Sequence, residues 1–179
     1  MEKILKRQDF LYTAAYCEEN IWHLCQKESF KNSCVIFIAS KGEYFPMLNQ
    51  QAAKDPLSPI LWDYHVVLLT TGVETRIVDF DTSLSFSTDI KTYLRRSFFD
   101  SKQIKIEHIP LFRLISCKEY STRFSSDRSH MKTQTGWLAT PPSWPTIVNK
   151  DNNLDQFTNM NNRDIGEIMT LEDLLERYR

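Results

Sequence analysis

The sequence is organised around the stretch Trp62-Asp63-Tyr64-His65-Val66-Val67-Leu68-Leu69. Aromatic and β-branched residues fill most of it, and Pro59 precedes it, so the pattern predicts a buried strand. Burying an ionisable group is costly unless that group is paired. The acid and the imidazole inside this apolar run therefore need partners or a chemical role, and His65 is the first candidate functional residue.

Length and composition are those of one domain of ordinary size, which we expect to span residues 1–179. The 22 Lys and Arg residues balance 23 Asp and Glu residues, so there is no basic excess of the kind that binds nucleic acid. No apolar stretch approaches the ~20 residues of a membrane span, and residues 1–7 lack the apolar core of a signal peptide. We expect no nucleic-acid partner and no membrane partner. We also expect a cytoplasmic location, in the cytosol, with the nucleus as an alternative compartment.

The cysteines also indicate a reducing compartment. They stand at positions 17, 25, 34 and 117 and form no Cys-x-x-Cys pair, which argues against a zinc or redox motif. On one helix, Cys17 and Cys25 would lie about 12 Å apart, which is too far for a disulfide. A set of reduced thiols is the simplest expectation.

Hydrophobic periodicity predicts helices at both ends of a run of strands. The predicted helices are about 13–28, 87–99 with Ser87 or Thr88 as its cap, and a last one opened by a capping box at Thr170–Asp173. The predicted strands are 34–39, 62–69, 76–81, 104–109 and 111–117, and the predicted loops are 46–59, 121–134, 141–145 and 149–163. This order favours an α+β fold with a largely antiparallel sheet packed against helices.

Three residues in this plan could work together. Cys17 falls near a helix N-terminus, where a thiol ionises more easily. The strand that returns after the Thr71–Glu74 turn can place Asp79 or Asp81 beside His65, because side chains alternate along a strand. A nucleophile, a base and an orienting acid would then meet. The alternatives are a small core cysteine and a hydrogen-bonded core histidine.

Four blocks of the sequence resemble a known family. They are Tyr16-Cys17-Glu18-Glu19-Asn20-Ile21-Trp22, Trp62-Asp63-Tyr64-His65-Val66, Asp79-Phe80-Asp81-Thr82 and Ser126-Asp127-Arg128-Ser129-His130-Met131. In this order they look like the signature blocks of protein N-terminal glutamine amidohydrolase, the family also named for its Trp-Asp-Tyr-His-Val motif. The resemblance covers about residue 10 to the C-terminal helix.

The resemblance implies a papain-like or transglutaminase-like core in a single catalytic domain. It implies a thiol amidohydrolase that converts the N-terminal glutamine of a protein to glutamate and releases ammonia, and whose product feeds the N-degron route. Carried over by motif, the nucleophile is Cys17, the base is His65 and the acid is Asp79, with Asp81 as the rival acid. No metal and no organic cofactor are expected.

Selectivity for a chain end requires a group that binds the α-ammonium, and Glu18, Glu19 and Asp63 are candidates. Each also has a structural alternative, as a helix N-terminal acid or a hydrogen-bond acceptor. Trp62 and Trp144 could wall the pocket. In the polar loop we expect Asp127 and Arg128 to pair and pin the chain beside the site, while His130 is an alternative base.

The competing functions use the same residues differently. A papain-like peptidase would cleave the peptide, and a transglutaminase-like acyltransferase would form an amine cross-link. A catalytically silent module would only hold peptide N-termini. For the leading interpretation we expect protein or peptide substrates that begin with Gln, and a monomer.

Overall fold

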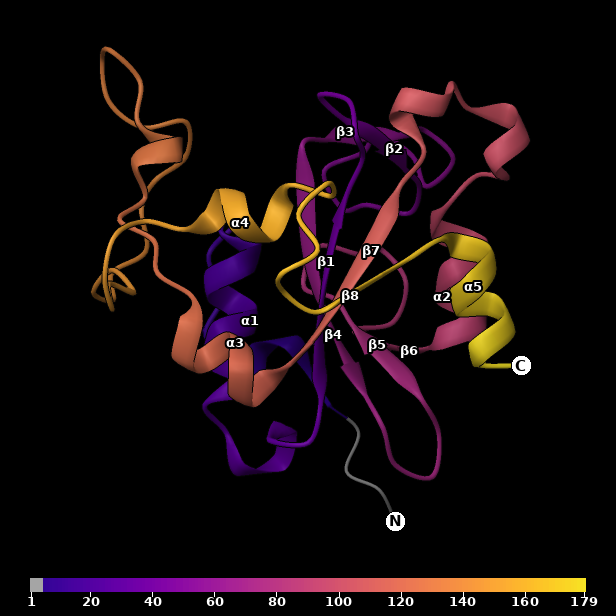
Figure 1. The fold of residues 1–179 in the computed structure, drawn as a ribbon, viewed down its shortest axis with the longest axis horizontal. Helices are drawn as coiled ribbons and strands as arrows, with labels where there is room; N and C mark the ends of the chain where they lie inside the picture. Colours follow the sequence, from indigo (N-terminus) through magenta and orange to yellow (C-terminus); the bar gives the residue numbers. More distant parts are fainter. Residues whose placement is uncertain (1–4) are drawn as a thin grey trace.

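The computed structural model describes residues 5–179. A six-stranded sheet with the order β6-β5-β4-β1-β7-β8 runs through the middle of the molecule (Figure 1), and every neighbouring pair in it is antiparallel. Its strands are β1 (Cys34–Ala39), β4 (Tyr64–Thr70), β5 (Arg76–Val78), β6 (Ser87–Asp89), β7 (Leu111–Ser116) and β8 (Glu167–Met169). The expected α+β class with a largely antiparallel sheet is confirmed.

Helices cover both faces of the sheet (Figure 1). One face carries α1 (Cys17–Cys25), α3 (Cys117–Arg123) and α4 (Leu154–Thr158), and the other carries α2 (Ile90–Ser97) and α5 (Leu171–Arg177). Alternate residues of β1 enter alternate cores: Val35 and Phe37 pack with α1, whereas Ile36 and Ile38 pack with α2. Both faces of the central strands are buried, which explains their nearly unbroken apolar sequences.

The sequence predicts one strand over residues 62–69, but the structure divides this stretch between two strands. Asp63 separates β4 from β3 (Ile60–Trp62), and β3 pairs with β2 (Phe45–Met47) in a separate two-stranded sheet. The Asp63 carboxylate accepts the N–H of Tyr64 at 2.9 Å, a local hydrogen bond that interrupts strand pairing. The predicted loop 46–59 is therefore wrong at its start, where Pro46 lies in a short strand of a sheet with only two strands.

Two other predicted elements are wrong. The helix predicted from Ser87 or Thr88 begins at Ile90, because 87–89 pair with β5 as an edge strand and Asp89 is the residue that caps α2. The strand predicted over 104–109 is replaced by a 3₁₀ turn at Ile106–His108, which follows another such turn at Ser101–Gln103. Asp100 opens the first of these turns by accepting the N–H of Lys102.

Short elements inside polar segments escape the periodicity argument. Examples are α3, capped by Ser116, α4 inside the predicted loop 149–163, and β8. The predicted helix 13–28 is α1, and it ends at Cys25. The capping box at Thr170 and Asp173 is present and begins α5 as predicted.

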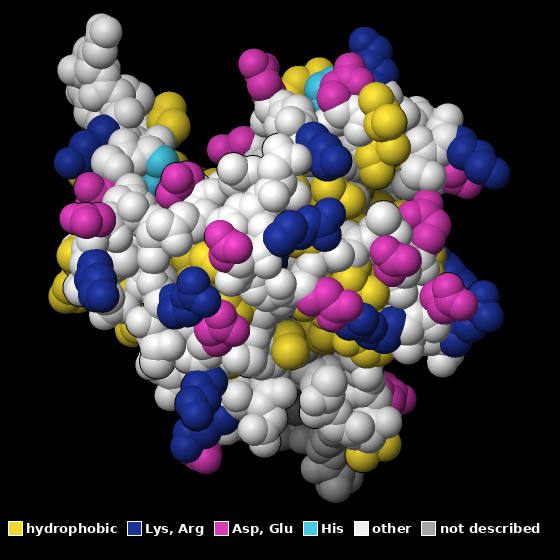
Figure 2. All heavy atoms as spheres, in the orientation of Figure 1, with side chains coloured by type: hydrophobic (Ala, Val, Ile, Leu, Met, Phe, Trp, Pro, Cys, Tyr) yellow, Lys and Arg dark blue, Asp and Glu magenta, His cyan; other side chains and the backbone are white. Residues whose placement is uncertain are grey.

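Lys and Arg side chains alternate with Asp and Glu side chains over the face in Figure 2. This mixture agrees with the formal net charge of −1. In the part of the chain that the structure describes, helices are all too short or too polar to cross a membrane.

Candidate active site

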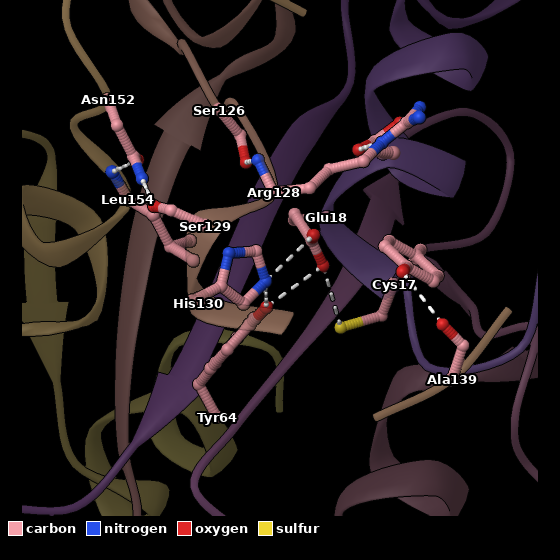
Figure 3. Close-up of polar contacts among 12 residues, drawn as sticks. Cys17, Glu18, Tyr64, Ser126, Arg128, Ser129, His130, Ala139, Asn152 and Leu154 are labelled. Carbon is pink, nitrogen blue, oxygen red and sulfur yellow. Dashed lines mark hydrogen bonds and ion pairs between the residues drawn. The ribbon is translucent and has the colours of Figure 1, made fainter. Parts of the chain in front are cut away.

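Cys17 is the first residue of α1, as the sequence predicts. The residue two positions earlier, Ala15, takes the left-handed conformation (φ 65°), which turns the chain sharply into the helix. The side chain of Tyr16 ties this turn to the polar loop, because its hydroxyl donates to the carbonyl of Ala139 at 3.1 Å (Figure 3). Cys17 is 7% exposed and contributes to the wall of a cavity of about 690 Å³.

His65 and Asp79 form a second buried group of the site. Nε2 of His65 lies 3.0 Å from Oδ1 of Asp79, and both residues are 0% exposed. A carboxylate only accepts hydrogen bonds, so His65 carries its proton on Nε2 and leaves the Nδ1 lone pair free. Asp79 is held in turn by the hydroxyl of Tyr93 at 2.8 Å and by the N–H of Asp81 at 2.8 Å.

Each member of this pair stabilises the charged form of the other. Burial by itself lowers the pKa of His65, but the Asp79 carboxylate, together with the charges of Asp81 and Glu18, more than offsets this and holds the pKa above its ordinary value. Burial pushes the pKa of Asp79 upward, and the imidazole and its other hydrogen bonds bring it below the ordinary value. Asp79 therefore stays ionised and orients the ring.

Asp81, the rival acid, lies beside this pair without bonding to the imidazole. Its carboxylate accepts the hydroxyl of Tyr12 at 2.7 Å, and burial raises its pKa. Ligand atoms of His65, Asp79 and Asp81 all lie within 4.8 Å of one another, which is close enough to share a metal ion. The hydrogen bonds among these residues, Tyr12 and Tyr93 already account for that grouping.

The Cys17 thiol points toward Glu18. Its sulfur donates to Oε2 of Glu18 at 3.7 Å (Figure 3). Within residues 5–179, Nδ1 of His65 accepts no hydrogen bond. Burial raises the pKa of the thiol well above its ordinary value and the Glu18 charge raises it further, while a hydrogen bond from the N–H of Val66 acts in the opposite direction. Since Val66 follows His65, the sulfur lies against the strand that carries the base.

Glu18 is itself part of a buried polar group. Its Oε2 accepts the hydroxyl of Tyr64 at 3.0 Å, and its Oε1 lies 3.6 Å from Nε2 of His130 (Figure 3). The Tyr64 hydroxyl is also 3.2 Å from that nitrogen. The structure thus brings His130 from the polar loop to the first turn of α1, beside Cys17 and at a different place from His65.

Glu19 has different partners from its neighbour. Arg128 donates to both of its oxygens at 2.7 Å, and the indole N–H of Trp144 donates to Oε2 at 2.6 Å. The expected pair between Asp127 and Arg128 is therefore wrong. The loop is pinned to α1 through Glu19, while Asp127 binds the N–H of Ser129 and the amide of Asn152.

The two remaining candidates, Trp62 and Asp63, also line the cavity. Trp62 stacks on the imidazole of His65 with the ring centroids 5.2 Å apart, which holds the ring in place. Asp63 is exposed and uses one oxygen for the N–H of Tyr64. Trp144 contacts Glu19 and His23 instead of lining the cavity.

The polar groups that position this site include three tyrosines that the sequence analysis did not single out. Tyr64 holds Glu18, Tyr93 holds Asp79 and Tyr12 holds Asp81. Tyr64 belongs to the quoted stretch and could have been noticed there, since its neighbours are Asp63 and His65. Tyr93 reads as one more apolar position of an amphipathic helix, and nothing in its spacing indicates that its hydroxyl meets an acid.

Comparison with known proteins identifies the class to which this chain belongs, namely enzymes that hydrolyse amides. Residues 12–178 match the family described as N-terminal glutamine amidase. The chain is 35% identical to the protein N-terminal glutamine amidohydrolase of Bos taurus, with 96% of this chain and 88% of the bovine chain aligned.

The proteins of that name from Homo sapiens and Drosophila melanogaster are 35% and 31% identical to it. These alignments cover 96% and 97% of this chain, and 89% and 90% of the human and fly chains. The chain therefore belongs to the N-terminal glutamine amidase family, as the four sequence blocks predict.

Proposed function

We propose that this protein is a thiol amidohydrolase that removes the side-chain amide of an N-terminal glutamine and releases ammonia. The observation that carries the proposal is the buried pair of His65 and Asp79, in which His65 lies on the strand that the sulfur of Cys17 contacts, in a member of this family. The proposed catalytic residues are Cys17 as nucleophile, His65 as base and Asp79 as the orienting acid.

The free lone pair of His65 defines its part in the reaction. Because Nε2–H is donated to Asp79, Nδ1 is the atom that takes the proton of the Cys17 thiol. In the structure the thiol is directed at Glu18 instead. Catalytic hydrogen bonds are often long or misaligned before the substrate is in place, so we expect the thiol to turn to His65 during the reaction.

The chemical steps follow from a thiolate beside an acid–base residue. The sulfur attacks the side-chain amide carbon of the terminal glutamine, and the N–H of Cys17, at the positive end of α1, stabilises the oxyanion. The imidazolium of His65 protonates the departing ammonia. The same residue then activates water, which hydrolyses the γ-glutamyl thioester and leaves an N-terminal glutamate.

Asp79 is the better orienting acid, because it holds the hydrogen bond to His65 while Asp81 is bound to Tyr12. We infer that the core is papain-like or transglutaminase-like and forms one catalytic domain over residues 1–179. The reaction as proposed requires no metal and no organic cofactor. We also propose that the enzyme is a cytosolic monomer that acts on proteins and peptides and feeds the N-degron route, without a nucleic-acid or membrane partner.

The proposal is tested by incubating the protein with matched peptides and measuring mass and ammonia. The peptides begin with Gln, Asn or Ala, and a fourth carries Gln internally. We expect conversion of the first peptide alone, with a gain of one dalton and one ammonia per peptide. Cleaved peptide would indicate a peptidase, an amine adduct would indicate an acyltransferase, and binding without conversion would indicate a silent module.

A further inference from the structure

The carboxylate of Glu18 lies beside the thiol, and one of its two oxygens has no hydrogen-bond donor in the described chain. Glu18 is 0% exposed, and among residues 5–179 its Oε1 accepts no hydrogen bond. The closest nitrogen recorded for it, Nε2 of His130, is 3.6 Å away, beyond hydrogen-bonding distance. A buried carboxylate oxygen that lacks a hydrogen bond is costly, so such atoms commonly serve a ligand or a reaction.

The surroundings of Glu18 favour a cation. The side chains that line the adjoining cavity include Asp63 and Asp155 and no Lys or Arg. The nearby guanidinium of Arg128 is already engaged by both oxygens of Glu19. Glu18 thus has two neutral donors on Oε2 and an imidazole 3.6 Å from Oε1, but no Lys or Arg in the cavity lining to balance its charge. A positively charged ligand group would balance it.

We propose that Glu18 binds the α-ammonium of the substrate's first residue, and that this contact restricts the reaction to chain ends. The inference rests on the proposed deamidation of N-terminal glutamine and names the group that selects its substrate. An internal glutamine has no ammonium and would leave the Glu18 carboxylate buried without a partner. Acetylation of the substrate's α-amino group would have the same effect.

The distances fit one glutamine residue. The sulfur of Cys17 lies 3.7 Å from Oε2 of Glu18 (Figure 3). Glu18 itself lies behind the cavity wall, but the three side chains nearest its carboxylate, those of Cys17, Tyr64 and His130, all line the cavity. In an extended glutamine the α-nitrogen is about 5 Å from the amide carbon. Asparagine is one carbon shorter, so its amide carbon would stop short of the sulfur while its ammonium is on Glu18.

Tyr64 and His130 hold the carboxylate for this role. A tyrosine hydroxyl has one proton, and Tyr64 directs it to Oε2 of Glu18, so it accepts from Nε2–H of His130. This chain of donors fixes one oxygen of Glu18 and leaves Oε1 for the ligand. Tyr64 and His130 are thus positioning residues in this proposal.

Binding at Glu18 would also release the nucleophile. The thiol of Cys17 donates to Oε2 of the carboxylate whose Oε1 the ammonium would bind. The positive charge on Oε1 would withdraw electron density from Oε2 and weaken the hydrogen bond from the thiol. Once the ammonium is bound, the thiol is free to turn to Nδ1 of His65. A chain end would therefore activate the cysteine as well as align the amide.

The test compares two substrates that differ only in the ammonium. One is a peptide beginning with Gln, and the other is its des-amino form, in which hydrogen replaces the α-amino group. We expect Glu18→Gln to lower kcat/KM for the Gln peptide about 100-fold, as for loss of a charged hydrogen bond, and to change that for the des-amino peptide less than about threefold. Equal factors for both substrates would overturn the proposal.

Glu19→Gln is the matched control, because it alters the adjacent carboxylate, which is bound to Arg128. It should change kcat/KM for the two substrates by one common factor. A second test uses wild-type protein alone, so that it does not depend on the folding of any variant. The preference for the Gln peptide over the des-amino peptide should fall as pH rises past the α-amino pKa of about 8, and a preference near one at pH 7 would refute the role of the ammonium.

A binding measurement separates this proposal from the proposed function. Cys17→Ala protein is titrated with the Gln peptide and with its Nα-acetylated form. The proposed site is supported if the Gln peptide binds with the lower Kd and if this difference is lost in the double variant Cys17→Ala, Glu18→Gln. Equal Kd values for both peptides overturn the site even if wild-type protein releases ammonia. Selective binding without any wild-type turnover would instead contradict the amidohydrolase function.

Discussion

Glu18 and Glu19 are adjacent in the chain and equally buried, yet their carboxylates lie in opposite surroundings. Glu19 is saturated, with two hydrogen bonds from Arg128 and one from Trp144. Glu18 faces the nucleophile and has an oxygen without a donor in the described chain. On one side of the first turn of α1 the carboxylate therefore ties the helix to the loop. On the other side a carboxylate oxygen is left for the ligand that we propose.

This contrast teaches how to separate function from structure when both use buried charge. A charge whose partners are all supplied by the fold acts as a tie between elements, here between α1 and the loop 126–145. A charge that the fold leaves unpaired imposes a cost, which a ligand can remove. Changes on the cavity side of this turn should therefore act mainly on the reaction, and changes on the loop side mainly on stability.

The largest effect is expected for Cys17→Ala. Ammonia release from a Gln peptide should fall by at least ~10³-fold, because no other group can form the thioester. The free energy of unfolding, measured in urea, should change little, since the thiol is a small side chain at the cavity wall. Cys34→Ala is the control and should retain activity, because Cys34 lies on β1 away from the cavity lining.

Asp79→Asn should come next, with a fall in kcat/KM on the order of 10³-fold, because the amide no longer holds His65 in the required tautomer. The Asp79 charge raises the pKa of His65 against the effect of burial, so the pKa of His65 should be lower in Asp79→Asn. Since the base works when neutral, the acid limb of the pH profile should move to lower pH. Asp81→Asn should have a much smaller effect on rate, and the reverse order would make Asp81 the orienting acid.

Glu19→Ala tests the loop side of the comparison. It should lower the free energy of unfolding by about 3–5 kcal/mol, because it leaves the buried guanidinium of Arg128 without its counter-ion. Glu18→Gln should change the same quantity by less than ~1 kcal/mol, or raise it, because it removes an uncompensated charge. Urea titrations of both variants measure this difference, and comparable losses would remove the distinction between the two carboxylates.

The smallest effect concerns the thiol itself. In Glu18→Gln the negative charge beside Cys17 is gone, and since that charge raises the pKa of the thiol, the pKa should fall. Alkylation of Cys17 by iodoacetamide at pH 7 should therefore be several-fold faster than in the wild type. An unchanged rate would mean that burial alone keeps the thiol protonated.

Much of the fold follows from the sequence where the pattern is strong. The strand at 34–39 and the capping box at Thr170 are as predicted, because each rests on contiguous residues. The errors at Asp63, at Asp89 and over 104–109 come from local side-chain hydrogen bonds and turns, which periodicity does not detect. Elements such as β8 are strands because of the neighbour that they pair with, and the sequence near them does not specify it.

The site was predictable as a set of residue types and only partly as a geometry. The hairpin brings Asp79 to His65 as expected. The choice between Asp79 and Asp81 depends on Tyr93, which lies on the helix after the hairpin, and on Tyr12, which is 69 positions from Asp81. The predicted partner of Arg128, Asp127, was likewise wrong, because the actual partner, Glu19, is 109 positions away. Long-range pairing of buried charge is the information that a single sequence lacks.

The central claim is that the Cys17 sulfur attacks the side-chain carbon of a substrate's first residue. It is tested most directly with a peptide whose N-terminal residue carries a chloromethyl ketone in place of the glutamine amide, followed by peptide mapping of the labelled protein. We expect one label per molecule, on Cys17, with loss of ammonia release and protection by excess Gln peptide. Label on another residue, or activity that survives complete labelling of Cys17, would contradict the account.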